Sequence, residues 1–120
     1  MGKAAISLTT GLEDSERVTV ALLVAVGAAE SGRPTLVFLT KEAVRLAVAG
    51  FARAVACDGC PPLDALMSRY AAAGGTFIVC GVCVDAKGLD PESFVDNARK
   101  GGTVQLWEWI GDEGATTFSY

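Results

Sequence analysis

The most informative segment of the chain is TFIVCGVCVDAKG, residues 76–88. Its first five residues, Thr76–Cys80, are mostly β-branched or aromatic and follow a Gly-Gly pair, which predicts a short buried strand. The strand ends on a thiol, Gly81 lets the chain turn sharply, and a second thiol follows at Cys83. Unpaired backbone N–H groups gather where a strand gives way to a helix start, and they favour an anion there. We therefore expect Cys80 to be the more reactive thiol, with the N–H groups after Gly81 directed at its sulfur.

Strand and helix patterns alternate on both sides of this segment. Apolar periodicity predicts strands at residues 3–9, 35–39, 76–80 and 115–119, and helices at residues 15–29, 41–48, 63–73 and 103–110. Residues 50–56 are ambiguous and are read as a short strand, while a short helix is expected from Asp90 until Gly101-Gly102 ends it. This alternation predicts an α/β fold: one domain over residues 1–120, with three α/β/α layers and a mostly parallel central sheet of about five strands.

Two helices carry apolar residues that decide how they pack. The helix over residues 15–29 has Val20, Leu23 and Val24 on the face opposite its main apolar stripe, so we expect it to be covered on most sides. In the helix over residues 103–110, Trp107 and Trp109 are two positions apart and must face nearly opposite ways. One tryptophan should fill the core, and the other is a candidate for a contact between subunits.

The composition limits the classes of function. Of the 120 residues, 51% are hydrophobic and only 20% are charged, which favours a buried interface between copies as well as a core. The net charge is −4 and the basic residues are scattered, so no nucleic-acid partner is expected. No apolar run approaches the ~18 residues of a membrane span, and the first residues lack a secretion-signal pattern. We therefore expect a cytoplasmic protein that contacts no membrane.

The chain has four cysteines and no histidine. Without histidine there is no Ser-His or Cys-His dyad and no histidine ligand for zinc. In a chain without a secretion signal, cysteines are expected to stay reduced and to serve chemistry or the core rather than to form disulfides.

The cysteine segment carries a family resemblance. A strand and helix at the start, a later strand ending in CGVCVDAKG, and a tail over residues 107–120 together resemble the DsrE/DsrF-like family. In that family a cysteine ends a central strand, and a basic residue and a glycine follow about two turns later, as Cys80, Lys87 and Gly88 do here. The resemblance implies a small cytoplasmic α/β protein of sulfur transfer that forms a homotrimer or homohexamer, has no cofactor, and works with sulfur-donor and sulfur-acceptor proteins.

The resemblance, together with the positions of residues along the chain, also suggests roles for individual residues. Cys80 would hold sulfane sulfur as a persulfide, and Cys83 would be the resolving or auxiliary thiol. Lys87 is a candidate for holding the thiolate, and Gly11 is expected to form part of the wall of the Cys80 pocket. If the two cysteine loops meet in space, Cys60 becomes a third thiol at this site.

Two other classes of function stay open at this point. Cys80 and Cys83 form a C-x-x-C pair, which a thioredoxin-like dithiol oxidoreductase would use. Cys57 and Cys60 form a second such pair, so the four read C-x₂-C-x₁₉-C-x₂-C, a spacing compatible with a zinc-stabilised interaction module. The intervening 19 residues are read as a full helix and a buried strand, unlike the short hairpin of a zinc ribbon.

Overall fold

Five parallel strands form one sheet in the computed structural model, which describes all residues from 1 to 120. The strand order is β4-β3-β2-β1-β5, and every neighbouring pair is parallel. The strands are β1 (Lys3–Leu8), β2 (Thr35–Leu39), β3 (Thr76–Cys80), β4 (Ala98–Gly101) and β5 (Ala115–Ser119). The predicted α/β class and the parallel sheet of about five strands are confirmed.

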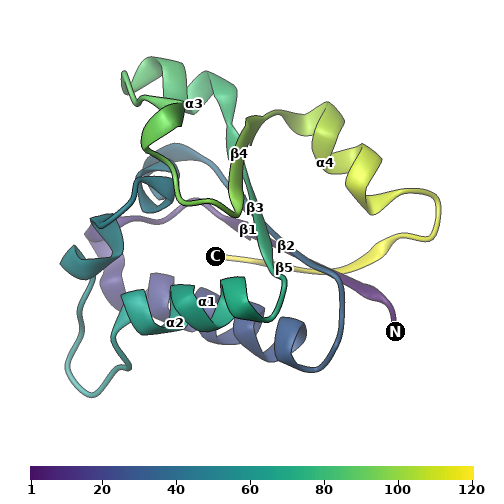
Figure 1. Ribbon diagram of the computed structural model, residues 1–120, viewed down its shortest axis with the longest axis horizontal. Coiled ribbons are helices and arrows are strands. Elements are labelled where there is room, and N and C mark those ends of the chain that lie inside the picture. The colour runs from purple at the N-terminus through teal and green to yellow at the C-terminus, as the bar shows by residue number, and fades with distance from the viewer.

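Helices cover both faces of this sheet (Figure 1). The α-helices are α1 (Ser15–Glu30), α2 (Leu63–Ala72), α3 (Gly81–Ala86) and α4 (Thr103–Ile110). Helices α1 and α2 lie together on one face, α4 lies on the other, and α3 continues from the end of β3. Short 3₁₀ helices complete the connections: η1 (Leu12–Asp14), η2 (Lys41–Ala47), η3 (Phe51–Ala54) and η4 (Pro91–Ser93).

The alternation of side chains along each strand divides the core between the two faces. On the α1–α2 face, 22 buried residues form one cluster, which includes Val37, Leu39 and Phe77. On the α4 face, a small cluster contains Leu36, Phe38 and Ile78, with Trp109 packed against it. Strands buried on both faces must be continuously apolar, which is why the pattern of β2 and β3 could be recognised in the sequence.

Most predicted elements are confirmed, and three need correction. Strands β2, β3 and β5 and helix α4 have the predicted bounds. Residues 50–56 contain the 3₁₀ helix η3 and no strand, because Gly50 takes a left-handed conformation (φ 86°) and starts a tight turn. Residues 41–48 form a 3₁₀ helix, η2, instead of an α-helix. The helix expected from Asp90 is only the turn η4, and the chain then enters strand β4, which Gly101 ends.

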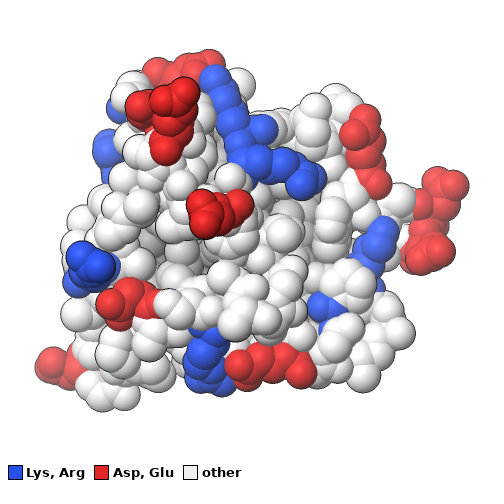
Figure 2. Space-filling view, viewed as in Figure 1, with Lys and Arg blue, Asp and Glu red and all other residues white.

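Several apolar side chains stay exposed on this single chain. Val20 and Leu23 on α1 are 41% and 42% exposed, so the chain alone does not cover this helix on most sides. Trp109 packs against the small cluster, whereas Trp107 is 67% exposed, in agreement with the expectation that the two face different ways. Figure 2 shows acidic and basic side chains interspersed on one face of the molecule. None of the helices has the length and apolarity needed to span a membrane.

Candidate functional site

The carboxyl ends of β1, β2 and β3 lie at one edge of the sheet, because the strands are parallel and in register. Cys80 is the last residue of β3 and the residue that precedes the first turn of α3. Cys83 lies in that first turn, and both thiols are free and half-buried. The strand-to-helix junction predicted for Cys80 is therefore present, with two unpaired thiols three residues apart.

The side chain of Cys80 lies where the two halves of the core meet. It packs against the large cluster on the α1–α2 face and against the small cluster on the α4 face. No side-chain hydrogen bond caps α3 at Cys80, so the expectation that the N–H groups after Gly81 donate to its sulfur is wrong. The Cys80 side chain instead packs against apolar neighbours of both clusters.

A backbone N–H group is instead directed at Cys83. The N–H of Lys41, at the start of η2, donates to Cys83 Sγ at 3.2 Å. Lys41 is the only non-glycine residue with a positive φ, at 53°, and this left-handed conformation is unfavourable for a residue with a side chain. The contact joins the end of β2 to the first turn of α3. The backbone donor that was expected for Cys80 is therefore found at Cys83.

Lys87 forms part of the same edge but pairs with a carboxylate rather than a thiol. Its ammonium lies 3.1 Å from Glu42 Oε2, and Arg45 Nε lies 3.4 Å from the other oxygen of Glu42. The hydrogen bond from Lys87, aided by the charge of Arg45, holds the pKa of Glu42 below its usual range. The ion pair thus provides a second link between η2 and α3, beside the link from Lys41 to Cys83.

Gly11 packs against the neighbouring backbone of η2. A Cβ added at Gly11 would lie 2.9 Å from the carbonyl oxygen of Glu42, closer than real Cβ atoms approach. Gly11 therefore lets the loop after β1 lie against η2. It contacts Glu42, the residue that pairs with Lys87 at the end of α3. Its expected place beside the candidate site is consistent with this packing.

Lys100 is the basic residue that lies over the start of α3. It belongs to β4, where its neighbour Gly101 pairs with Cys80. A Cβ added at Gly81 would be 3.3 Å from Lys100 Cε, so the lysine stem covers Gly81. The ammonium group pairs with Asp85 Oδ1 at 2.7 Å, with both side chains largely exposed. The stem of Lys100 therefore covers the start of α3, and its charge is paired with Asp85.

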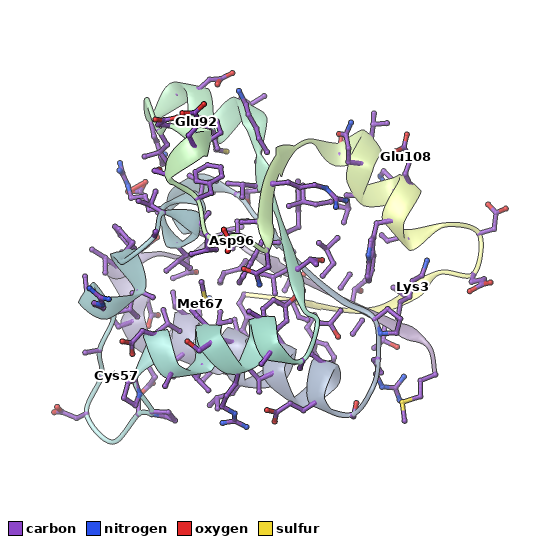
Figure 3. The ribbon with its side chains drawn as sticks, viewed as in Figure 1. Lys3, Cys57, Met67, Glu92, Asp96 and Glu108 are labelled. Atoms are coloured by element: carbon purple, nitrogen blue, oxygen red, sulfur yellow. A yellow bond between two sulfur atoms is a disulfide. The ribbon has the colours of Figure 1, made fainter.

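Cys57 and Cys60 are joined to each other by a disulfide, which corrects the expectation that all four cysteines are reduced. Their Cα atoms are 5.3 Å apart in a tight turn, a separation that a disulfide bridges readily. Cys57 lies far from α3 in the common view of Figures 1 and 3. No three cysteine or carboxylate side chains converge in a way that would hold a metal, so the four-cysteine zinc set does not assemble. Cys60 is likewise not a third thiol beside Cys80.

Sequence reasoning missed three residues at this edge. Lys41 and Glu42 begin η2, one residue after the end of β2, and the end of a strand next to β3 in a parallel sheet was the available signal for them. Lys100 had no such signal, because β4 was not recognised as a strand.

The fold and the thiol pair define the class of protein: a small α/β protein with free cysteines at the carboxyl end of a central strand. The model of the DsrE/DsrF-like family matches residues 2–118, so the chain belongs to this family. Membership implies a sulfur-relay-like role. A comparison with curated proteins found no match.

Three solved structures share the fold. The ychN protein from E. coli is 20% identical with a TM-score of 0.80, and the alignment covers 100% of both chains. MTH1491 from Methanobacterium thermoautotrophicum, described as a protein of unknown function, is 12% identical with a TM-score of 0.76, also over 100% of both chains. BT1422 from Bacteroides thetaiotaomicron, a conserved protein of unknown function, is 17% identical with a TM-score of 0.68, over 99% of this chain and 95% of that one. At these identities the likeness establishes the fold alone.

Proposed function

We propose that this protein is a sulfur carrier that holds sulfane sulfur as a persulfide on Cys80. The observation that carries the proposal is the pair of free, half-buried thiols, Cys80 and Cys83, at the carboxyl end of the central strand β3. Family membership supports a sulfur-relay type of chemistry at this place.

The proposed reaction is an exchange of one sulfur atom between thiolates. The Cys80 thiolate attacks the outer sulfur of a donor persulfide, and the donor thiolate leaves. An acceptor thiolate then attacks the outer sulfur of the Cys80 persulfide and regenerates the Cys80 thiolate. Each step breaks one S–S bond and forms another, so no external oxidant or reductant is needed.

Cys83 provides a second outcome for the same intermediate. Its thiolate can attack the inner sulfur of the Cys80 persulfide, which forms a Cys80–Cys83 disulfide and releases hydrosulfide. The hydrogen bond from Lys41 holds the Cys83 sulfur towards η2, where it is not bonded to Cys80. We infer that this contact delays the release of hydrosulfide and gives an acceptor time to take the sulfur.

The surface around the thiols is suited to the binding of partner proteins. Val82, between the two cysteines, is 79% exposed and offers an apolar contact beside the sulfur atoms.

The experiment is intact-mass analysis after incubation with a small-molecule persulfide donor. Wild-type protein and Cys83→Ser should each gain one sulfur atom, whereas Cys80→Ser should gain none. Cys83→Ser should also hold the added sulfur longer, because its nearby attacking thiol is gone.

Cys57→Ser/Cys60→Ser is the matched control, because it removes the disulfide outside the proposed site without freeing a new thiol, and it should load sulfur as wild type does. Loading of Cys80→Ser but not of Cys83→Ser would show that the nucleophile is assigned to the wrong thiol. Loading of neither wild type nor Cys83→Ser would reject the carrier function and favour the dithiol redox alternative.

We also propose that the chain works as a homo-oligomer, a trimer or a hexamer. Large apolar side chains in contact with solvent support this assembly: Val20, Leu23, Val104, Trp107 and Phe118. Light scattering at micromolar concentration is the measurement, and a species of 12.4 kDa would contradict the proposal.

A further inference from the structure

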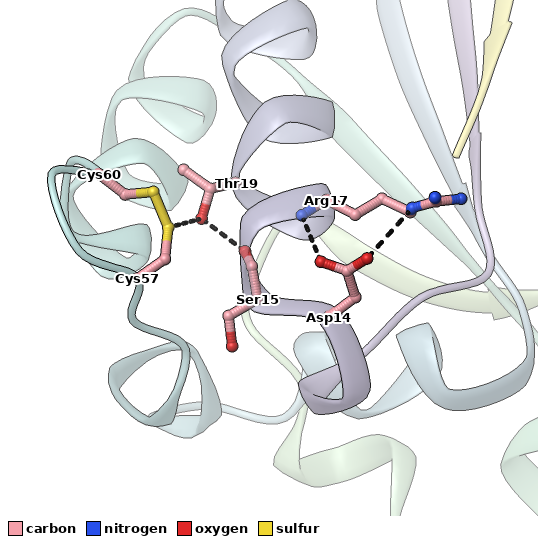
Figure 4. Close-up of a disulfide and its surroundings, with 6 residues drawn as sticks. All are labelled: Asp14, Ser15, Arg17, Thr19, Cys57 and Cys60. Atoms are coloured by element: carbon pink, nitrogen blue, oxygen red, sulfur yellow. Dashed lines mark hydrogen bonds and ion pairs between the residues drawn. A yellow bond between two sulfur atoms is a disulfide. The ribbon is translucent and has the colours of Figure 1, made fainter.

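The loop before α2 carries a second C-x-x-C pair, which the proposed sulfur carrier does not use. Cys57 and Cys60 are three positions apart and form a disulfide between η3 and α2 (Figure 4). The site is separate from Cys80 and Cys83, because Cys57 lies far from α3, the helix that follows Cys80 and contains Cys83, in the common view of Figures 1 and 3. Its chemistry therefore needs its own explanation.

The backbone, and not only the S–S bond, brings the two sulfur atoms together. The N–H of Cys60 donates to the carbonyl oxygen of Cys57 at 3.1 Å, which closes a four-residue turn. Gly59 supplies the left-handed residue of this turn (φ 75°), and nothing lies within 4 Å of the place of a Cβ there. On either side, Val55 and Leu63 are buried in the core. The turn should therefore keep its conformation when the disulfide is reduced, so the two thiols stay close enough to form the disulfide again.

A purely mechanical role does not explain this disulfide well. The bond closes a ring of only four residues and joins no segments that are distant in the sequence. The stabilisation that a disulfide gives to the folded chain grows with the length of the loop it closes. The exposed residues Asp58 and Gly59 at the tip also leave the turn open to an attacking thiol.

The surroundings of the two sulfur atoms are unequal. Cys57 Sγ lies 3.8 Å from the hydroxyl oxygen of Thr19, a residue of α1 that is only 2% exposed. That hydroxyl donates to the carbonyl oxygen of Ser15 at 2.8 Å and can turn to donate to a thiolate at Cys57. Cys60 is followed by Pro61 and Pro62, which have no N–H to offer. Cys57 is therefore the better leaving thiolate, and Cys60 is the sulfur to attack.

We propose that Cys57 and Cys60 form a reversible dithiol–disulfide site that exchanges electrons with an external dithiol, independently of Cys80. One thiolate of the external dithiol attacks Cys60 Sγ, the S–S bond breaks, and Cys57 leaves as the thiolate. The second thiolate of the external dithiol then attacks its own sulfur in the mixed disulfide and frees Cys60. The external dithiol is oxidised by two electrons to a disulfide, and the protein gains two thiols.

The test uses Cys80→Ser/Cys83→Ser protein, so that only Cys57 and Cys60 react and a failure of the sulfur-carrier proposal has no effect on the result. Alkylation of the folded protein followed by intact-mass analysis counts the free thiols. We expect no alkylated thiol after preparation without reductant, two after dithiothreitol with an unchanged far-UV circular dichroism spectrum, and loss of both after the dithiothreitol is removed and oxidised glutathione is added. Reduction that occurs only in denaturant, or a dithiol form that does not close again, would overturn the proposal.

A matched pair of variants tests the positioning role of Thr19. Thr19→Val removes the hydroxyl at nearly constant volume and should slow the appearance of free thiols with dithiothreitol, while Thr19→Ser, which keeps a hydroxyl, should react as the parent does. Equal rates for the two variants would overturn the assignment of Cys57 as the leaving thiolate.

Discussion

Gly75, the residue before β3, gives a sharp test of how the core holds the central strand. A Cβ at this position would overlap the ring atoms Cδ1, Cε1 and Cζ of Tyr70. Tyr70 is fully buried, and its ring packs edge-on against Phe77 with the centroids 5.0 Å apart. Its hydroxyl donates to the carbonyl oxygen of Thr76 at 2.7 Å and lies 3.1 Å from that of Thr35. The ring therefore has no free direction in which to move.

The cost of Gly75→Ala follows from these contacts. Overpacking of a tight core costs about 1–3 kcal/mol. If the ring is displaced, the buried hydroxyl and its carbonyl partners lose their hydrogen bonding, which costs about 1–3 kcal/mol more. We expect the free energy of unfolding to fall by about 2–5 kcal/mol, a large part of the roughly 5–15 kcal/mol that is typical of a domain.

The assay is urea unfolding followed by circular dichroism, with Gly27→Ala as the matched control. Gly27 lies inside α1, and a Cβ there would meet nothing within 4 Å. The same chemical change should therefore raise the free energy of unfolding at Gly27, by about 0.5–1 kcal/mol, because alanine is the better helix former.

A third variant shows whether the ring of Tyr70 is the cause. In a Tyr70→Leu background the aromatic ring is gone, so Gly75→Ala should cost clearly less than in wild type, as expected for coupled neighbours. An unfolding free energy of Gly75→Ala close to that of wild type would refute the reasoning, and so would an equal cost in the two backgrounds.

Three further predictions concern the pH dependence, the backbone and the disulfide. Burial raises the pKa of Tyr70 in the folded protein, so the stability that this tyrosine contributes is complete below the unfolded-chain pKa of about 10 and is lost as the pH rises above it. The urea midpoint of wild type should therefore fall at alkaline pH, and Tyr70→Phe should make this fall smaller. Lys41→Gly should raise the free energy of unfolding by about 0.5–1 kcal/mol. It relieves roughly 1–2 kcal/mol of left-handed strain in the folded protein, which exceeds the cost of the extra backbone freedom that a glycine gives the unfolded chain. A lower urea midpoint would contradict this. Reduction of the Cys57–Cys60 disulfide should lower the free energy of unfolding by no more than about 2 kcal/mol, which is the chain-entropy value for a four-residue ring. A larger loss, measured by urea unfolding, would mean that the disulfide stabilises more of the structure than its own turn.

The sequence was sufficient to predict the elements that carry a strong local pattern. β2 and β3 are continuous apolar runs between turn residues, and such runs have few alternatives to a buried strand. β4 was missed because it reads Ala-Arg-Lys-Gly, four residues with two charges and an exposed middle. It is a strand because its backbone forms hydrogen bonds with the edge of β3. The local sequence of β4 does not reveal this pairing, because β3 lies about twenty residues earlier in the chain.

The candidate site was predictable in its thiols but not in their surroundings. Cys80 and Cys83 lie where the strand-to-helix pattern placed them. The donor to Cys83 comes from Lys41, 42 positions earlier in the chain, through a backbone group that every residue except proline has. The partner of Lys87 is Glu42, which only the packing of η2 against α3 selects. Contacts of this kind depend on tertiary geometry, so spacing along the chain could not reveal them.

The two C-x-x-C pairs show how the same spacing leads to different geometry: one pair forms a disulfide and the other stays as two free thiols. At Cys57 and Cys60 the backbone turns back on itself at Gly59, so the two side chains meet and the disulfide forms. At Cys80 and Cys83 the first cysteine ends a strand and the second lies inside a helix, where its sulfur is held by the N–H of Lys41. A pair held apart in this way keeps one thiol available to accept a sulfur atom, whereas a pair held together suits the exchange of two electrons. The backbone conformation between the cysteines, more than their number or spacing, therefore determines which of the two reactions each pair can support.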